Sequence, residues 1–533
     1  MMESYDMSLN MKETWDAIVI GAGVGGLTAA AHLVKEGNRV LVLERNPHVG
    51  GTVYVYHRKG FAFPMGPLGF SHPGLVQRTL KDLGAGEDLR FSRVHYRLRA
   101  FGLNLPLSLP FAEMVRELSR LFPADAEAVE QFFKDTDELI SKQSGDSNRS
   151  KLRQTGDISA SDYLRNLIKD WRLRRILGSI GTREPYSGLP LLAAMWNLMS
   201  NEGIWFPEGG MDSFCDRLAK AVVGNGKGGS EIRLNQGVAK IQLEQGKASG
   251  VILKDGTRIS SSSVISNADY KTAFLKLMDP KAISPGWYDA VSRARQTGSV
   301  FQVCLGVDAG KADLSAFKKA GRLIYRRNMK NAQGREELDR SAQEIDPELF
   351  AGQELEVSLW GKDWEMAVSE GKASVVIRAE AEYHHFAQYR LGWRQRSPEY
   401  QAYKSQLARA VMQEIAHLIP GLEKAALVMD IATPLTFEDQ GGRSGGAVAG
   451  WSWDYEDFQD DQPQELILTP IRGLYMAGYQ AFSALFMGGV PTAMESGKRA
   501  AQAALQGMGP VDKILIPGVP PIRSGLPKEA PGQ

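Results

Sequence analysis

Residues 15–44 read WDAIVIGAGVGGLTAAAHLVKEGNRVLVLE, and this stretch decides the fold. The run from Trp15 to Ile20 is short, apolar and rich in β-branched residues, which is typical of a buried parallel strand. A glycine-rich turn follows, and then a helical pattern that ends at Gly37. The run from Arg39 to Leu43 predicts a second strand. Together these segments predict a complete β-α-β unit.

The turn GAGVGG has the spacing G-x-G-x-x-G. Gly21 allows the tight turn, Gly23 lets the backbone approach a pyrophosphate, and Gly26 lets helix and strand pack closely. The free N–H groups and the positive dipole of the helix N-terminus favour phosphates. Glu44 ends the second strand, where a carboxylate can bond ribose hydroxyls. We therefore predict a dinucleotide site that includes Gly21, Gly23, Val24, Gly25, Gly26 and Glu44.

The residues after the second strand bear on which dinucleotide binds. Glu44 would repel a 2′-phosphate, which disfavours NADP. Arg45 follows, and then a second glycine pair, Gly50 and Gly51, in ERNPHVGG. A glycine pair just past the ribose-binding acid suits the long, extended pyrophosphate of FAD lying against the backbone. The alternative for the pair is an ordinary loop.

In this stretch the sequence resembles the family of FAD-dependent phytoene desaturases, carotenoid isomerases and retinol saturases. Residues 205–219, WFPEGGMDSFCDRLA, are similar to the family's segment before a long helix. Residues 231–241, EIRLNQGVAKI, resemble the family's strand pair whose backbone near Val238 holds adenine. Residues 254–257, KDGT, indicate a hairpin turn, and VISNAD at 264–269 resembles the segment that closes this part. The resemblance implies FAD as the cofactor.

The C-terminal block carries the same resemblance. It comprises TPLT at 433–436, GAVAGW at 446–451 and GLYMAGYQAFSALFMGGVPTAMESGKRAA at 473–501. A strand ends at Gly478, and Gly488 and Gly489 precede a helix that begins with a proline, which fits a first helical turn. The resemblance directs this helix N-terminus at the N1/O2 edge of the flavin, where its dipole stabilises the anionic reduced ring. The implied cofactor contacts are Gly478, Gly489 and Val490.

Two positions depart from the family pattern. Many flavoenzymes carry an acid after the glycine at 478, where this chain has Tyr479. The family often has an aspartate where Pro64 stands, which points to a changed reaction rather than a changed fold. The candidates for residues near the reacting atoms are Tyr186, Trp451 and Tyr479. His384 and His385 have no third ligand at suitable spacing, so we expect a structural or exposed pair and no metal.

The predicted class is α/β, with a Rossmann-type, doubly wound FAD-binding domain that is discontinuous in sequence. It comprises residues 1–100, 205–295 and 425–510. Residues 101–204 and 296–424 form an inserted α+β substrate domain over the flavin, with helices in its first part. Residues 511–533 form a proline-rich tail that we expect to be extended or loose.

The composition of the chain argues against several classes of protein. The 533 residues carry a formal net charge of +1, which argues against a nucleic-acid binder. Two cysteines, Cys215 and Cys304, are too few for a disulfide framework and fit a reducing cytoplasm. No stretch reaches the ~18 apolar residues of a spanning helix, and the acidic N-terminus is no secretory signal. We expect a cytoplasmic protein that touches the membrane surface to collect its substrate.

Three reactions remain open. The first is desaturation or saturation of C–C bonds in an isoprenoid or polyene, with an unknown electron acceptor or donor. The second is a redox-neutral polyene isomerase, which the altered Pro64 segment supports, and the third is an amine-oxidase-like reaction. A flavoprotein without catalysis is a fourth possibility. The resemblance implies an apolar tunnel, whose candidate linings are Phe101 to Phe111 and Leu189 to Phe206. Two alternatives for the segment from Leu189 to Met199 are a core helix and a helix that dips into one leaflet of a membrane.

Overall fold

The computed structural model describes most of the chain. The described residues are 14–86, 88–143, 159–224, 229–327, 338, 341–360, 368, 370–452, 464–483, 489–511, 513–514 and 522–523. Only short pieces of the proline-rich tail belong to this set, among them the strand pair β25 (Lys513–Ile514) and β26 (Ile522–Arg523). The expectation of a loose tail therefore lies largely outside the described residues.

A five-stranded parallel sheet forms the centre of the first domain, and the predicted α/β class is confirmed. Its order is β10 (Glu231–Arg233), β3 (Val40–Leu43), β2 (Ala17–Ile20), β14 (Val264–Ser266) and β23 (Leu474–Met476). Every neighbouring pair in it is parallel. Three segments far apart in sequence thus build one sheet, in which β2, β3, β14 and β23 are short and fully buried.

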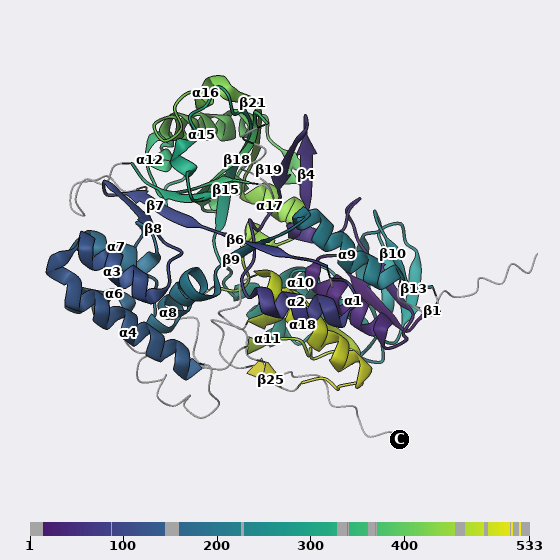
Figure 1. Cartoon of the computed structure of the whole chain (residues 1–533). Coiled ribbons are helices and arrows are strands. Elements are labelled where there is room, and N and C mark those ends of the chain that lie inside the picture. The colour runs from purple at the N-terminus through teal and green to yellow at the C-terminus, as the bar shows by residue number, and fades with distance from the viewer. Residues whose placement is uncertain are drawn as a thin grey trace, which may run out of the picture.

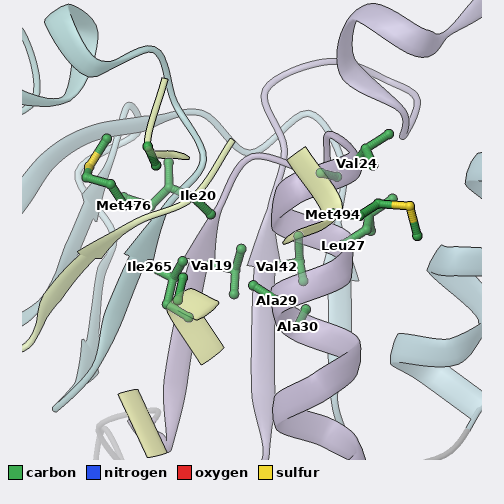
Figure 2. Packing of buried hydrophobic residues seen from close by; sticks show 14 of the residues in the cluster. Val19, Ile20, Val24, Leu27, Ala29, Ala30, Val42, Ile265, Met476 and Met494 are labelled. Atoms are coloured by element: carbon green, nitrogen blue, oxygen red, sulfur yellow. The ribbon is translucent and has the colours of Figure 1, made fainter. Parts of the chain in front are cut away.

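Two helices pack against each other beside this sheet. They are α1 (Val24–Lys35) and α18 (Gly489–Leu505). Small residues allow the close approach, since a Cβ at Gly497 would fall well inside contact distance of the Gly25 carbonyl oxygen. Figure 2 shows Ala29 and Ala30 on the side of α1 that faces Val42. The glycine turn at the start of α1 is therefore held by packing on two sides.

A four-stranded sheet lies beside the central one. Its order is β1 (Thr14–Trp15), β13 (Arg258–Ser261), β12 (Lys247–Leu253) and β11 (Val238–Glu244). The predicted hairpin at 254–257 joins β12 to β13. The segment 231–241 was expected to be a strand pair, but β10 and β11 belong to different sheets, because the chain crosses from one to the other at residues 234–237. Helix α9 (Gly210–Gly224) follows the GGM segment as predicted.

A seven-stranded sheet forms the second domain. Its order is β21 (Ala426–Ala432), β15 (Ser299–Asp308), β18 (Lys372–Ala381), β17 (Leu355–Leu359), β16 (Arg322–Tyr325), β7 (Tyr96–Ala100) and β8 (Leu103–Pro106). One face is apolar and packs with α12 (Pro347–Ala351) and α15 (Glu399–Ala416) in a second core. Strands β7 and β21 lie within the ranges 1–100 and 425–510, so chain from those ranges enters this sheet.

Helices fill the part of the chain between β8 and residue 204, as the periodicity predicts. They are α3 (Phe111–Leu121), α4 (Ala126–Gln143), α6 (Ala160–Leu167), α7 (Trp171–Ser179) and α8 (Leu189–Asn197), gathered around a third core. Figure 1 shows them together on one side of the molecule, apart from α15 and from α1 with α18. Helix α8 is a core helix. In the part of the chain that the structure describes, no helix combines the length and apolarity needed to cross a membrane.

Shorter elements connect these layers. They are β4 (Val55–Arg58), β5 (Phe61–Pro64), α2 (Pro73–Asp82), β6 (Phe91–Val94), β9 (Ile204–Pro207), α10 (Tyr270–Leu275), α11 (Pro285–Arg293), α14 (His384–Ala387), β19 (Arg390–Gly392), β20 (Gln395–Arg396), α16 (Leu422–Ala425), α17 (Pro434–Gly441), β22 (Gln464–Glu465) and β24 (Phe482–Ser483). The pairing of β6 with β9 joins the start of the helical part to its end.

Candidate functional site

The glycine turn between β2 and α1 is built as the motif predicts. Gly21 has a φ of +95°, in the region that favours glycine, and Gly23 caps α1 without a side chain. A Cβ at Gly23 would lie 2.8 Å from the Asn267 Nδ2 atom. A Cβ at Gly26 would run into the Gly21 carbonyl oxygen, so this glycine serves the packing of helix on turn. Gly23, at the N-terminus of α1, lines the cavity beside the Asn267 side chain.

The second glycine pair touches the first turn. Gly50 has a φ of +100° and Gly51 a φ of +56°. The Gly50 N–H donates to the Ala22 carbonyl at 2.8 Å, and a Cβ at Gly51 would lie 3.1 Å from the Gly23 Cα atom. The two turns therefore form one continuous surface of bare backbone, which an extended phosphate chain can approach closely.

Glu44 lies at the end of β3 with only 5% of its surface exposed. Its two carboxylate oxygens accept hydrogen bonds from the backbone N–H groups of Ala22 and Asn46, each at 2.8 Å. These bonds fix the side chain beside the first glycine turn. Next to it, the Arg45 guanidinium donates to the Asp439 carbonyl at 3.0 Å, and burial lowers the pKa of Arg45.

The C-terminal glycine segment meets the same turn. Gly478 has a φ of +100°, and its N–H donates to the Ser496 hydroxyl of α18 at 2.8 Å. A Cβ at Gly25 would lie 2.8 Å from the Gly478 nitrogen. The Asn267 side chain stands between these backbones. Two glycine-rich segments that are more than 400 residues apart therefore lie against each other.

One cavity joins these segments. Its volume is about 710 Å³, within the range of ligand-binding pockets. Among the residues predicted to bind a dinucleotide, the cavity is lined by Gly21, Gly23, Val24, Gly25, Glu44, Arg45, Gly50, Gly51, Val238, Gly478, Gly489 and Val490. Gly26 is outside the lining. The residues predicted from the glycine-rich segments thus line one cavity, together with many others that were not predicted.

The charge of the lining favours an anionic ligand. Six cationic side chains line the cavity, against four carboxylates: Arg45, Lys254, Lys276, Arg378, Arg390 and Arg443, against Glu44, Asp269, Glu438 and Asp439. The excess of two positive charges matches the two negative charges of a diphosphate bridge. With the bare glycine backbones, this lining fits a dinucleotide such as FAD.

The segment from Pro64 to Leu68 is held against the second domain by side chains. The Gln302 amide donates to the Pro64 carbonyl at 3.0 Å, Arg378 donates to the Gly66 carbonyl, and Arg322 donates to the Leu68 carbonyl. These three donors stand on strands β15, β18 and β16 of the seven-stranded sheet, with β17 between β18 and β16, on the face opposite the apolar core. They fix Gly66 and Pro67, which line the cavity.

The three candidates for residues near the reacting atoms lie in different surroundings. Tyr479 lines the cavity, and burial raises the pKa of its phenol to about 12. Trp451 is buried, donates from Nε1 to the Gln480 carbonyl at 3.0 Å, and packs against Tyr270. Tyr186 packs on the third core. Trp451 and Tyr186 are therefore outside the cavity lining.

The segments expected to line an apolar tunnel also lie outside this cavity. No residue from Phe101 to Phe111 or from Leu189 to Phe206 lines this cavity. Leu105 and Leu107 are fully buried in the third core with Trp196 of α8, because the apolar faces of these segments pack on one another. A tunnel lined by these segments stays a prediction.

His384 and His385 form part of α14, where their rings contact each other, as a structural pair would. His385 is buried and His384 is exposed. Within the described ranges, no group of three or more histidines, cysteines or acids could hold a metal ion.

Several residues of the site escaped the sequence analysis. Asn267 and Asp269 lie in the VISNAD segment, whose family resemblance was a usable signal for them. Arg443 and Trp393 line the cavity without any motif around them. Arg378 is one of many charged residues in alternating strands, so nothing local distinguishes it.

Comparison with known proteins agrees with this geometry. The sequence model of the family described as flavin containing amine oxidoreductase matches residues 24–372. A zebrafish (Danio rerio) protein described as an inactive all-trans-retinol 13,14-reductase is 24% identical, over 90% of this chain and 85% of its own length. Prolycopene isomerase of Daucus carota is 30% identical over 51% of this chain. The match spans about half of that relative, 49% of its length.

Solved structures share the fold. An oxidoreductase from Methanosarcina mazei superposes with a TM-score of 0.61 at 19% identity, covering 90% of this chain and 99% of its own. A redesigned putrescine oxidase superposes with a TM-score of 0.57 at 17% identity, covering 93% of this chain and 99% of its own. At these identities the likeness shows the fold alone.

Proposed function

The chain belongs to the family of flavin containing amine oxidoreductases and uses FAD, and from this premise we propose its reaction and its site. The protein is an oxidoreductase that desaturates or saturates C–C bonds of a long apolar isoprenoid or polyene. The observation that carries the proposal is the cavity where both glycine turns and the N-terminus of α18 converge.

Most of the residues predicted to bind the cofactor line this cavity, which supports the following assignment. The N-terminus of α1 and the glycine pair would hold the diphosphate, Glu44 the ribose, and Val238 the adenine. Gly478 and the start of α18 would hold the ring end. The residues that we assign to FAD are Gly21, Gly23, Val24, Gly25, Glu44, Arg45, Gly50, Gly51, Val238, Gly478, Gly489 and Val490, with Gly26 supporting the turn.

The chain itself must orient the ring and its substrate. When bound, FAD supplies a hydride acceptor or donor at its N5 atom. The α18 N-terminus, whose residues Gly489, Val490 and Ala493 line the cavity, would stabilise negative charge on the ring. Tyr479 is protonated at neutral pH, since its pKa is raised to about 12, so it can donate a hydrogen bond but is a poor base.

The substrate class follows from the named relatives. The carrot relative is named a prolycopene isomerase, and a Pseudescherichia vulneris relative, 26% identical over 57% of this chain, is named a phytoene desaturase. Prolycopene and phytoene are isoprenoids. The zebrafish relative is named after retinol but is described as inactive. We assign an apolar substrate of this class to the present chain. We also propose that the protein contacts a membrane surface and exchanges electrons with a partner. Flotation with liposomes would test the membrane contact, and a protein that stays at the bottom of the gradient would refute it.

A redox-neutral isomerase is the second candidate. It is favoured by the similarity to the carrot prolycopene isomerase and by Pro64, where the wider family often carries an acid. An amine-oxidase-like reaction is weaker, because putrescine oxidase shares only the fold.

An anaerobic assay separates these reactions. The holoprotein is mixed, in oxidised and in photoreduced form, with phytoene, prolycopene and all-trans-retinol, and products are identified by chromatography. Bleaching of oxidised flavin by phytoene indicates a desaturase, and reoxidation of reduced flavin with one saturated product per flavin indicates a saturase. Product formation without net change of the flavin indicates an isomerase. A parallel assay in air tests amines, because reduced flavin releases hydrogen peroxide only by reaction with O2. Peroxide release with amines there, together with no turnover of any polyene in the anaerobic assay, would refute the proposal.

A further inference from the structure

A hairpin of the second domain reaches the cavity at the end where Glu44 lies. It consists of β19 and β20, with Trp393 and Arg394 at its tip, and we call it the 390–396 hairpin. Arg394 has a φ of +57°, which is uncommon for a residue with a side chain. The tip is therefore held in a defined conformation by its contacts.

Those contacts centre on one buried carboxylate of α17. Asp439 is 4% exposed and accepts from the Arg390 guanidinium at 2.9 Å, from the Arg396 guanidinium at 2.5 Å and from the Arg394 N–H at 3.1 Å. Arg390 also pairs with Glu438 at 2.6 Å. Burial acts to raise the pKa of Asp439, but the hydrogen bonds from both arginines outweigh it and leave that pKa lowered. The base of the hairpin is thus fixed to α17.

The tip presents an aromatic face to the cavity. Arg390, Gly392 and Trp393 line it together with Glu44, Val238 and Lys254 of the first domain. The Trp393 side chain is 53% exposed, and the Lys254 Nζ atom lies 4.9 Å from its ring centroid. The Arg394 Cζ atom lies 4.4 Å from the centroid of the same ring, and the Arg394 guanidinium donates to the Asn46 side-chain oxygen at 3.4 Å. A half-exposed indole beside two cations suits a flat ring attached to phosphate, which would take the place of Lys254 or Arg394 on the indole face.

We propose that the 390–396 hairpin binds the adenylate end of FAD, with the Trp393 indole against the adenine. This inference rests on the proposed placement of FAD, with Glu44 at the ribose. The second domain then takes part in cofactor binding as well as covering the flavin ring. Stacking of a base on an aromatic side chain accounts for roughly tenfold in affinity, and it tolerates another aromatic residue.

The experiment compares Trp393→Ala with Trp393→Phe and with Leu391→Ala. Leu391 is a matched control, because it lies on the same hairpin, is 68% exposed and is outside the cavity lining. The dissociation constant of FAD is measured by titrating each apoprotein, and that of ADP by calorimetry. ADP carries the adenylate without the flavin ring, so it reports on this end of the site alone. Melting temperatures of the apoproteins check that each variant folds.

Trp393→Ala is expected to weaken FAD and ADP binding by the same factor, about tenfold. Trp393→Phe should stay within about threefold of the parent, and Leu391→Ala should not differ from it. If Trp393→Ala binds FAD and ADP as tightly as Leu391→Ala does, the proposal is overturned. A loss for FAD alone would also overturn it, because that places the effect at the ring. A parent protein that binds no FAD would refute the proposed function instead.

Discussion

Glycines at the first turn are needed for two different physical reasons. Gly23 leaves room on the cavity side, where the end of the Asn267 side chain opposes a Cβ at 2.8 Å and the Gly51 Cα atom lies at an ordinary contact distance of 3.9 Å. Gly26 leaves room on the protein side, where the Gly21 carbonyl blocks a Cβ. Because a side chain can move and a backbone carbonyl cannot, the two positions separate cofactor binding from folding.

Gly26→Ala is expected to abolish soluble folded protein or to lower its melting temperature sharply. Gly23→Ala should fold and lose FAD affinity by tenfold or more. Gly224→Ala is the control, since a Cβ there meets nothing within 4 Å, and it should change stability by less than about 0.5 kcal/mol. Thermal melting and FAD titration check all three. A Gly26→Ala variant as stable as Gly224→Ala would contradict the assignment.

Glu44 offers a test of the ribose end. In Glu44→Gln, one of the two oxygens becomes an NH2 group that faces a backbone N–H of Ala22 or Asn46. The lost acceptor should cost about 1–3 kcal/mol, seen as weaker FAD binding or lower stability. Glu36→Gln, at an exposed position after α1, is the control. Unchanged FAD titration and melting of Glu44→Gln would count against this role.

At the scale of elements, α1 carries a partly buried histidine, His32. Burial lowers the pKa of His32 to about 4, against a value near 6.5 in the unfolded chain. Because the folded pKa is the lower one, the unfolded chain binds the proton more readily. The stability linked to neutral His32 is therefore complete above pH 6.5 and declines as the pH falls towards 4.

This linkage predicts a loss of about 2 kcal/mol between pH 7.5 and pH 5. Urea unfolding of the parent and of His32→Gln at both pH values measures it. The difference in stability between the two proteins should shift by that amount, in favour of the variant at pH 5. His417→Gln, at an exposed site, should show no such shift. Parallel pH dependence in the parent and His32→Gln would disprove the linkage.

The 64–68 segment is an element held by side chains. Gln302→Leu removes the donor to the Pro64 carbonyl and the acceptor of the Arg378 guanidinium, which donates to it at 2.8 Å. The unpaired groups should cost about 1–3 kcal/mol and speed amide exchange at 64–68. Exchange mass spectrometry measures this, with the exposed Gln502→Leu as control. Equal exchange in both variants would mean that other contacts hold the segment.

Across the whole molecule, the parts predicted from sequence are those with local physical causes. The β-α-β unit, Glu44 and the glycine pair depend on short-range spacing, and the start of α18 depends on a glycine followed by a proline. The contacts of Arg378 with Gly66 and of Arg394 with Asn46 join residues more than 300 positions apart, so no local pattern marks them. Tyr186 and Trp451, two of the three candidates for residues near the reacting atoms, pack within the cores and lie outside the cavity lining.

Contacts between distant residues also decide which segments belong to each domain. Three separate segments form one parallel sheet because each strand is too short to be stable without its neighbours. The seven-stranded sheet draws β7 and β21 from ranges expected to belong to the FAD domain, since strand pairing is decided by contacts between distant residues.

The central claim is that both glycine-rich regions enclose one FAD. The most direct measurement is the absorbance spectrum of the purified protein, with identification of the flavin released on denaturation. We predict flavin bands and one FAD per chain, either as isolated or after incubation with added FAD. A colourless protein that takes up no FAD under these conditions would contradict the account.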